Sequence, residues 1–271
     1  MCYSKEVQLA TGSTIMLLGS FYYVVYSMRY RALDKPWLMP FLKNVVLGFM
    51  MIGAHQVFEF LSLTTQDQWV YKVGLLLSIS SMYFFLRSLE TLLNRSVKSW
   101  LALVVIGGVA VHALFVTLPF GAHDFYVRHS AGFIWASAWM LLFIYFHICA
   151  LRGWRVLRDE RSKRAVLTFL LATLDISFII SALYVLWGYW HFGVNVCTDS
   201  PSIWCTFYVV QLVALPVFLT ALPRLLDCPA EKTQQALKET IVSLAVSVVV
   251  LCILISTLPF FRCLNMKFVF P

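Results

Sequence analysis

Charged side chains are scarce in this sequence. Only 13% of its 271 residues are Asp, Glu, Lys or Arg, which is about half the share found in soluble domains. Hydrophobic residues make up 61% of the chain, and the mean hydropathy is +0.80. A soluble domain cannot cover its surface with so few charges, so the sequence predicts a polytopic protein of a cell membrane.

Internal repeats, low-complexity tracts and long polar linkers are also missing. We therefore expect a single transmembrane domain over residues 1–271. The first residues lack the basic stretch, short apolar core and small-residue cleavage site of a signal peptide. The first apolar run is expected to act as its own insertion signal.

Eight apolar runs are long enough, at about 20 residues each, to cross the roughly 30 Å hydrocarbon core of a bilayer. They lie near residues 9–28, 39–63, 69–93, 100–120, 131–151, 165–190, 203–224 and 239–260. Tryptophans such as Trp69 and Trp100 fall at the ends of runs, as interfacial anchors do. The sequence thus predicts an all-α polytopic membrane bundle of about eight transmembrane helices, a seven-helix core with one extra C-terminal helix.

Lys and Arg residues favour every second loop. They follow the first, third, fifth and seventh runs, and six of them lie between Arg152 and Arg164. The alternate loops, such as 64–68 and 191–202, carry none. Because basic loops stay in the cytoplasm, we expect both termini to lie outside. Topology then accounts for the net charge of +8, so the expected partner is the lipid bilayer and not nucleic acid.

Ionisable residues inside the second run need an explanation, because each costs roughly 2.5–3.5 kcal/mol to insert into a bilayer. His55 and Glu59 lie four residues apart, on one face of a helix, and Gln56 lies beside them. They either hydrogen-bond one another and hold this helix to a neighbour, or form one wall of a ligand, metal or proton site. The sequence leaves both interpretations open.

Further residues of metal-ligand type gather toward the predicted outer side. His112 lies at the same depth in the fourth run as His55 in the second, Cys2 precedes the first run, and Cys205 begins the seventh. Two histidines on neighbouring helices would suit haem b, whereas His, Cys and Glu together favour zinc or copper. No HxxxH, HExxH or CxxC motif accompanies them. A disulfide among Cys2, Cys197 and Cys205 is the competing interpretation.

Asp175 lies in the middle of the sixth run. Apolar surroundings favour the neutral form of a carboxyl group. We therefore expect a carboxylic acid that is hydrogen-bonded across helices, unless a cation such as Lys43 or Arg87 pairs with it. A proton-handling role is the alternative.

Three short motifs, in this order, resemble an uncharacterised family of bacterial integral membrane proteins. They are the opening Met1–Ser4, the pair Gln56 and Glu59, and the stretch Ser202–Cys205. Members of the family begin Met-Cys-Phe-Ser or similar, carry Gln-Gln and then Glu-Gly in the second helix, and have Trp-Cys in the last. The resemblance covers residues 1–222 and implies a multi-pass protein of the bacterial inner membrane, without an activity to transfer.

This chain departs from the family pattern by having His55 in place of the first Gln, Phe60 in place of the Gly, and an extra helix at 239–260. The resemblance singles out Cys2, Glu59 and Cys205 as residues that act together.

These observations predict an outward-facing His/Cys/Glu site. Its expected ligands are Cys2, His55, Glu59 and Cys205, with His112 as a fifth member. It would bind a metal ion or haem, either for redox chemistry or as part of a subunit of a larger membrane complex. A small-molecule or proton-coupled transporter and a membrane-embedded hydrolase are the alternatives. Whether the protein is an enzyme is left open by the sequence.

Overall fold

The computed structural model of the protein describes residues 5–30, 35–93, 97–115, 130–158, 160–192, 203–227 and 231–257. These residues form eight α-helices and no strand, which confirms the predicted all-α bundle. The helices are α1 (Lys5–Tyr30), α2 (Leu38–Thr65), α3 (Gln68–Leu92), α4 (Trp100–Phe115), α6 (Ser130–Val156), α7 (Arg161–Phe192), α8 (Ile203–Asp227) and α9 (Thr233–Thr257).

Seven of these helices are long and apolar enough to cross a membrane, so the chain is a multi-pass membrane protein. The exception is α4, whose 16 residues are apolar but extend only about 24 Å at about 1.5 Å per residue. The fourth predicted run continued to residue 120, and residues 116–129 lie outside the described part of the chain. Helix α9 begins at Thr233, earlier than the predicted residue 239.

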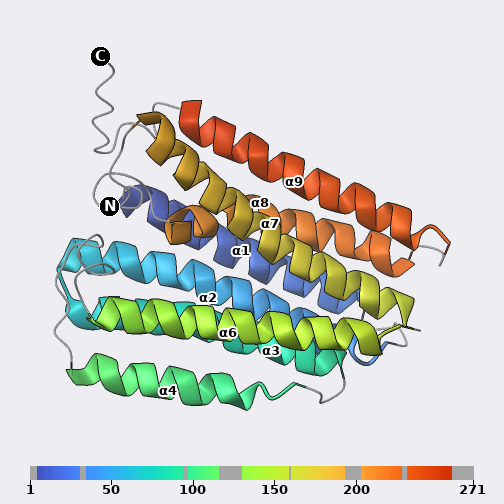
Figure 1. Ribbon diagram of the computed structural model, residues 1–271, viewed down its shortest axis with the longest axis horizontal. Helices are drawn as coiled ribbons and strands as arrows, with labels where there is room; N and C mark the ends of the chain where they lie inside the picture. Colours follow the sequence, from blue (N-terminus) through green and yellow to red (C-terminus); the bar gives the residue numbers. More distant parts are fainter. Residues whose placement is uncertain are drawn as a thin grey trace.

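The helices run up and down along one axis, and α1 begins at the end of the bundle where α9 finishes (Figure 1). Helix α4 forms one edge, where it packs on α3 and α6. Helix α9 forms the opposite edge, on α7 and α8. Helices α1, α2, α3 and α8 pack between them, and α2 contacts the other three. This arrangement encloses α2, which with α8 is the most buried of the long helices among the described residues.

Aromatic side chains fill the centre of the bundle. Phe85 packs edge to face against Phe49 at 5.3 Å and against Phe146 at 6.4 Å between ring centroids, which joins α3 to α2 and α6. Phe169 of α7 stacks on Phe218 of α8 at 5.2 Å. The outer surfaces are equally apolar, since large aliphatic side chains are exposed on α4, α6, α7 and α9. Bilayer hydrocarbon is the environment that suits such a surface.

A tight turn fixes α2 against α3. Gln66 ends α2 in the left-handed conformation, with φ of 58°, and its backbone N–H donates to the Ser62 carbonyl oxygen. Asp67 then begins α3, because its side chain accepts a hydrogen bond from the backbone N–H of Trp69 at 2.7 Å. The resulting antiparallel hairpin places the first turns of α3 beside the polar residues of α2.

Helix α1 meets α2 through glycines. A Cβ atom added to Gly12 would overlap the carbonyl oxygen of Gly53, and one added to Gly53 would lie 2.8 Å from the carbonyl oxygen of Gly12. The two backbones therefore touch, as small residues allow between membrane helices. The same contact brings the side chain of Gln56 against α1.

Helix α8 contains Pro216 and Pro223. Proline has no backbone N–H, so Pro223 cannot donate to the carbonyl oxygen of Leu219 one turn earlier. The hydroxyl of Tyr26 from α1 donates to that oxygen instead. Lys35 adds a hydrogen bond from its ammonium group to the Leu226 carbonyl oxygen at 3.2 Å, at the C-terminal end of α8. The first bond holds α8 to α1, and the second holds α8 to Lys35, which lies just before α2.

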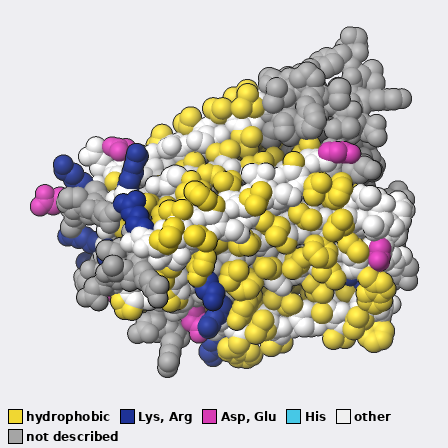
Figure 2. Space-filling model, turned by 180° about the vertical axis from the view of Figure 1, so that it is seen from behind, with side chains coloured by type: hydrophobic (Ala, Val, Ile, Leu, Met, Phe, Trp, Pro, Cys, Tyr) yellow, Lys and Arg dark blue, Asp and Glu magenta, His cyan; other side chains and the backbone are white. Residues whose placement is uncertain are grey.

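Most of the Lys and Arg side chains visible in Figure 2 gather at one end of the molecule. It is the end that holds the connection between α6 and α7. Clustering of this kind is what the positive-inside rule requires of the cytoplasmic side. The placement of that side in the cytoplasm stays a prediction, and we refer to the opposite end as the predicted outer end.

Candidate functional site

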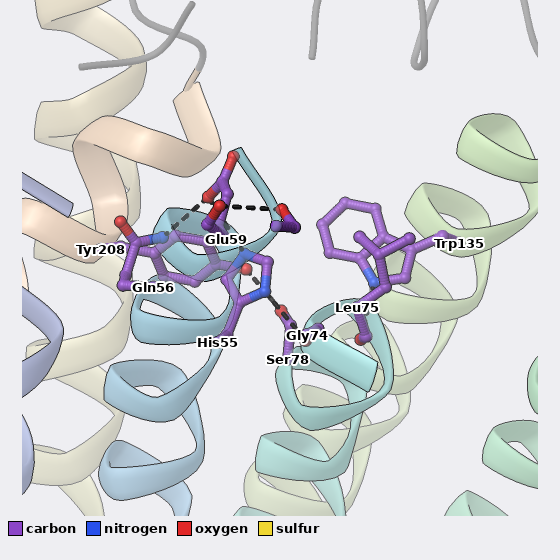
Figure 3. Close-up of polar contacts among 9 residues, drawn as sticks. His55, Gln56, Glu59, Gly74, Leu75, Ser78, Trp135 and Tyr208 are labelled. Atoms are coloured by element: carbon purple, nitrogen blue, oxygen red, sulfur yellow. Dashed lines mark hydrogen bonds and ion pairs between the residues drawn. The ribbon is translucent and has the colours of Figure 1, made fainter. Parts of the chain in front are cut away.

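A cluster of buried polar side chains lies near the predicted outer end of α2. It consists of His55, Gln56 and Glu59 from α2, Gln8 from α1 and Tyr208 from α8, and we call it the outer-end cluster. All five side chains are enclosed, with exposed fractions between 1% and 5%. Figure 3 shows His55 directed toward α3, and Gln56 and Glu59 on the same side as Tyr208. Polar groups from three helices therefore meet inside an otherwise apolar bundle.

The imidazole of His55 is held in one orientation. Its Nδ1 atom lies 2.9 Å from the carbonyl oxygen of Gly74 on α3. A carbonyl oxygen only accepts hydrogen bonds, so Nδ1 carries the proton and Nε2 keeps its lone pair in the neutral ring. The ring also packs edge to face on Tyr208, with centroids 5.0 Å apart. His55 thus presents a free nitrogen at a fixed position.

That nitrogen faces Glu59. The distance from His55 Nε2 to Glu59 Oε2 is 3.7 Å, which is too long for a direct hydrogen bond. Gln56 Nε2 donates to the same Oε2 atom at 3.4 Å, and the side chain of Gln8 also hydrogen-bonds the carboxylate. The hydroxyl of Ser62 donates to the backbone oxygen of Glu59 and leaves the carboxylate free for these partners. Among the described residues, no Lys or Arg side chain pairs with Glu59.

The surroundings of the cluster contain further hydrogen-bonding groups. Tyr208 and Ser78 of α3 share a hydrogen bond of 2.5 Å between their hydroxyl oxygens. The side-chain oxygens of Gln8 and Gln211 are buried and have no hydrogen-bond partner within the described part of the chain. Buried acceptors are normally satisfied. A cation or a hydrogen-bond donor beside either oxygen would satisfy it.

The separation of His55 and Glu59 is suited to a shared metal ion. Two ligand atoms about 2.1 Å from one zinc ion, at an angle of about 109°, stand about 3.4 Å apart. The observed 3.7 Å corresponds to a slightly wider angle at the same bond lengths. These are two candidate ligands, and the described residues contain no group of three or more His, Cys, Asp or Glu side chains that could hold a metal ion.

The two cysteines predicted to complete the site are not both described. Cys2 lies outside the described residues, as does Cys197. Cys205 lies in the first turn of α8, one turn before Tyr208, the residue that contacts His55. The structure therefore brings His55, Gln56 and Glu59 together. Cys205 belongs to α8, the helix whose Tyr208 contacts His55. The ligand role of either cysteine stays a prediction.

His112 is not brought to this cluster. It lies on α4, which packs against α3 and α6 and makes no contact with α2 in the described part of the chain. Its Nε2 atom is buried without a hydrogen-bond partner among the described residues. Equal depth along two helices does not make their side chains neighbours. The structure gives no support to a haem held between His55 and His112.

A second ionisable pair lies between α6 and α7, and sequence reasoning missed it. Asp175 Oδ1 lies 2.6 Å from Nε2 of His147. Neither of the partners suggested from the sequence pairs with Asp175 in the described part of the chain. Arg87 pairs with Glu90 at 2.7 Å, and the side chain of Lys43 is exposed on α2. One signal could have found the pair, because both residues lie away from the helix ends in consecutive helices joined by a short loop. Such helices pack side by side in a membrane.

No protein-family model, curated protein or solved structure matches this chain. The resemblance to the bacterial membrane-protein family accordingly stays a prediction. The function has to be argued from the chemistry of the bundle itself.

Proposed function

We propose that this membrane protein binds a zinc or copper ion near the predicted outer end of its bundle. The proposed ligands are Nε2 of His55, Oε2 of Glu59 and the thiolates of Cys2 and Cys205. The observation that carries the proposal is the 3.7 Å separation of the His55 and Glu59 ligand atoms, with a lone pair on each.

The hydrogen bonds that His55 and Glu59 make to residues other than the proposed ligands support metal ligation. A histidine that binds a metal usually donates its other N–H to a carbonyl or carboxylate, and a ligating carboxylate is itself hydrogen-bonded. His55 donates from Nδ1 to Gly74, and Glu59 accepts from Gln56 and Gln8. These bonds fix the ligand atoms before any ion binds, so the ion does not have to order them.

The charge of the cluster also supports metal binding. A buried carboxylate without a paired cation is costly in an apolar interior. Glu59 is 5% exposed, and the described residues supply it with amides and a neutral imidazole, so the positive charge that acts on it is that of the amino terminus of the chain. A bound metal ion would bring further positive charge to the carboxylate.

The ligand set selects the kind of metal. Thiolate and imidazole ligands favour zinc or copper over magnesium and calcium, which prefer oxygen. A copper ion in such a site would serve one-electron redox chemistry, and a zinc ion would hold the helices together or act within a larger membrane complex.

Metal content tests the proposal. The purified protein is incubated separately with Zn²⁺ and Cu⁺, desalted, and its metal-to-protein ratio is measured by mass spectrometry of the elements. We expect about one ion per chain, as a single closed site requires, and its loss in His55→Gln, Glu59→Gln and Cys205→Ser. His112→Gln is the matched control, because it removes a membrane histidine that lies on α4. Equal metal content in the wild type and in His55→Gln would contradict the proposal.

A disulfide between Cys2 and Cys205 is the competing structure. It would consume both thiolates, so that His55 and Glu59 would be the only two of the four proposed ligands left. Alkylation of the unfolded protein without reductant, followed by measurement of the intact mass, counts the free thiols. We expect the thiols of Cys2 and Cys205 to be alkylated after metal removal, and blocked thiols at both positions would contradict the thiolate ligands.

A further inference from the structure

The pair formed by His147 and Asp175 is separate from the outer-end cluster. It joins α6 to α7, whereas the cluster belongs to α1, α2 and α8. The proposed metal site does not use either residue. Two ionisable groups within membrane-spanning helices nevertheless call for a function, because they are costly there.

The hydrogen bonds of His147 fix where its protons lie. Its Nδ1 atom is 2.8 Å from the carbonyl oxygen of Phe143, one turn earlier on α6. Nδ1 therefore carries a hydrogen, which leaves Nε2 to face Asp175 Oδ1 at 2.6 Å. One proton occupies this short bond. It belongs either to a carboxylic acid that donates to a neutral imidazole, or to an imidazolium that donates to a carboxylate.

The surroundings of the pair are apolar. The His147 ring contacts Phe143 and Phe146, with centroids 4.3 and 5.4 Å apart, and Phe178 of α7 packs on Phe143 at 5.6 Å. The pair is not fully enclosed, because the side chains of His147 and Asp175 are 23% and 39% exposed.

Large aliphatic side chains flank the pair along both helices. Ile144 and Ile148 on α6 and Ile179 on α7 are large exposed hydrophobic residues within one turn of the pair along their helices. These side chains form part of the surface that suits hydrocarbon. Water does not stabilise separated charges in such surroundings.

Several other ionisable groups of the packed helices make contacts elsewhere. On α3, Arg87 pairs with Glu90, and Lys72 lies over the Trp69 ring. On α9, Glu239 accepts a hydrogen bond from Gln235. On α6 itself, the Tyr145 hydroxyl accepts from the backbone N–H of Lys98. Helix α8 carries no charged side chain between Tyr208 and Arg224, and on α4 the ionisable side chain is His112. Among the described charged groups, Asp175 is the one that acts on the His147 ring.

We propose that His147 and Asp175 form a proton-binding site that faces the lipid, in which Asp175 holds the shared proton as a carboxylic acid. The neutral acid and neutral imidazole avoid a separation of charge in hydrocarbon, and the bond to Phe143 keeps Nε2 oriented to accept. Loss of this proton leaves one negative charge on the pair. A second proton gives an imidazolium beside a neutral carboxylic acid and leaves one positive charge on the pair, with the imidazolium N–H donating to the carbonyl oxygen of the acid.

The reaction of carboxylic acids with dicyclohexylcarbodiimide tests this state, because the reagent dissolves in hydrocarbon. The acid adds across a C=N bond of the carbodiimide: its proton passes to nitrogen, and its oxygen bonds to the central carbon. The product rearranges to an N-acylurea without losing atoms. Membranes containing the full chain are treated, and the α7 peptide is examined by mass spectrometry for the adduct on Asp175.

We expect the adduct on Asp175, its loss in Asp175→Asn, and no adduct on Glu59, which is enclosed in the bundle. Glu59→Gln is the matched control and should leave labelling of Asp175 unchanged. The variant His147→Gln should also be labelled, since an unpaired carboxyl in hydrocarbon is protonated. Zinc or copper content should be unaffected by Asp175→Asn, which separates this test from that of the metal site.

Three outcomes would overturn the proposal. Labelling of His147→Gln but not of the wild type would show that the resting pair is an imidazolium and a carboxylate. Equal labelling of the wild type by a water-soluble carbodiimide would show that the pair faces water. Absence of labelling in both proteins would show that Asp175 is not a lipid-accessible acid. Elution of each variant as a single folded species on size-exclusion chromatography is required before labelling is compared.

Discussion

In the outer-end cluster, single hydrogen bonds fix the positions of single side-chain atoms. Gly74 sets which nitrogen of His55 carries hydrogen, and Gln56 sets the position of one oxygen of Glu59. Tyr208 supports the other side of the imidazole, and its own orientation depends on the hydroxyl of Ser78. The chemistry of the cluster therefore depends on residues that are not among the proposed ligands.

The hydrogen bond between Tyr208 and Ser78 should contribute measurably to stability. Tyr208→Phe removes the hydroxyl and is expected to lower the free energy of unfolding by about 0.5–1.5 kcal/mol, the usual net value of such a bond. Thermal unfolding in detergent provides the measurement. The double variant with Ser78→Ala should cost little more than either single change, because both remove the same bond. Fully additive losses would contradict a direct bond.

At the level of helices, the contact between α1 and α2 decides the shape of the cluster. Gln8 reaches Glu59 because α1 lies directly on α2, and this approach requires glycine at positions 12 and 53. The packing of two backbones thus determines how many amides surround the carboxylate.

Gly12→Ala is expected to push α1 away from α2, since its Cβ atom would overlap the Gly53 carbonyl oxygen. Overpacking of this kind costs typically about 1–3 kcal/mol. The loss should appear as a lower midpoint of thermal unfolding and as weaker metal binding. Gly107→Ala on α4 is the matched control, because no atom lies within 4 Å of its added Cβ. A variant at Gly12 as stable as that control would contradict the close contact.

The whole molecule has one basic end and one end that carries the cluster. Figure 2 shows the gathering of Lys and Arg that the loops of the sequence predicted. If the basic end is cytoplasmic, the proposed metal site would face outward, where it could receive an ion without passage through the bilayer.

Cysteine labelling in intact cells tests this orientation. Thr64→Cys lies at the end of α2 and Arg158→Cys lies after α6, and both positions are exposed. A membrane-impermeant maleimide should label the first variant in intact cells and the second only after lysis, relative to the parent protein. The reverse pattern would place the outer-end cluster in the cytoplasm.

The helices were predictable from the sequence because the bilayer sets their length, and an apolar run of that length has few alternatives. The grouping of His55, Gln56 and Glu59 was predictable for the same kind of reason, since helical spacing alone puts them together. Contacts between helices were not. Asp175 pairs with His147 and not with Lys43 or Arg87, because helix order in the bundle decides which runs are adjacent.

The importance of Tyr26 depends on Pro223, a residue far away from it in the chain. Tyr26 occupies the carbonyl oxygen of Leu219 that Pro223 leaves without its helical donor. Tyr26→Phe should therefore destabilise the protein by about 1–3 kcal/mol, the cost of a buried acceptor left unpaired. In a Pro223→Ala background the new N–H can serve Leu219, and the same change should cost clearly less in thermal unfolding. The two positions are epistatic, so substitutions at one should be tolerated or rejected according to the residue present at the other.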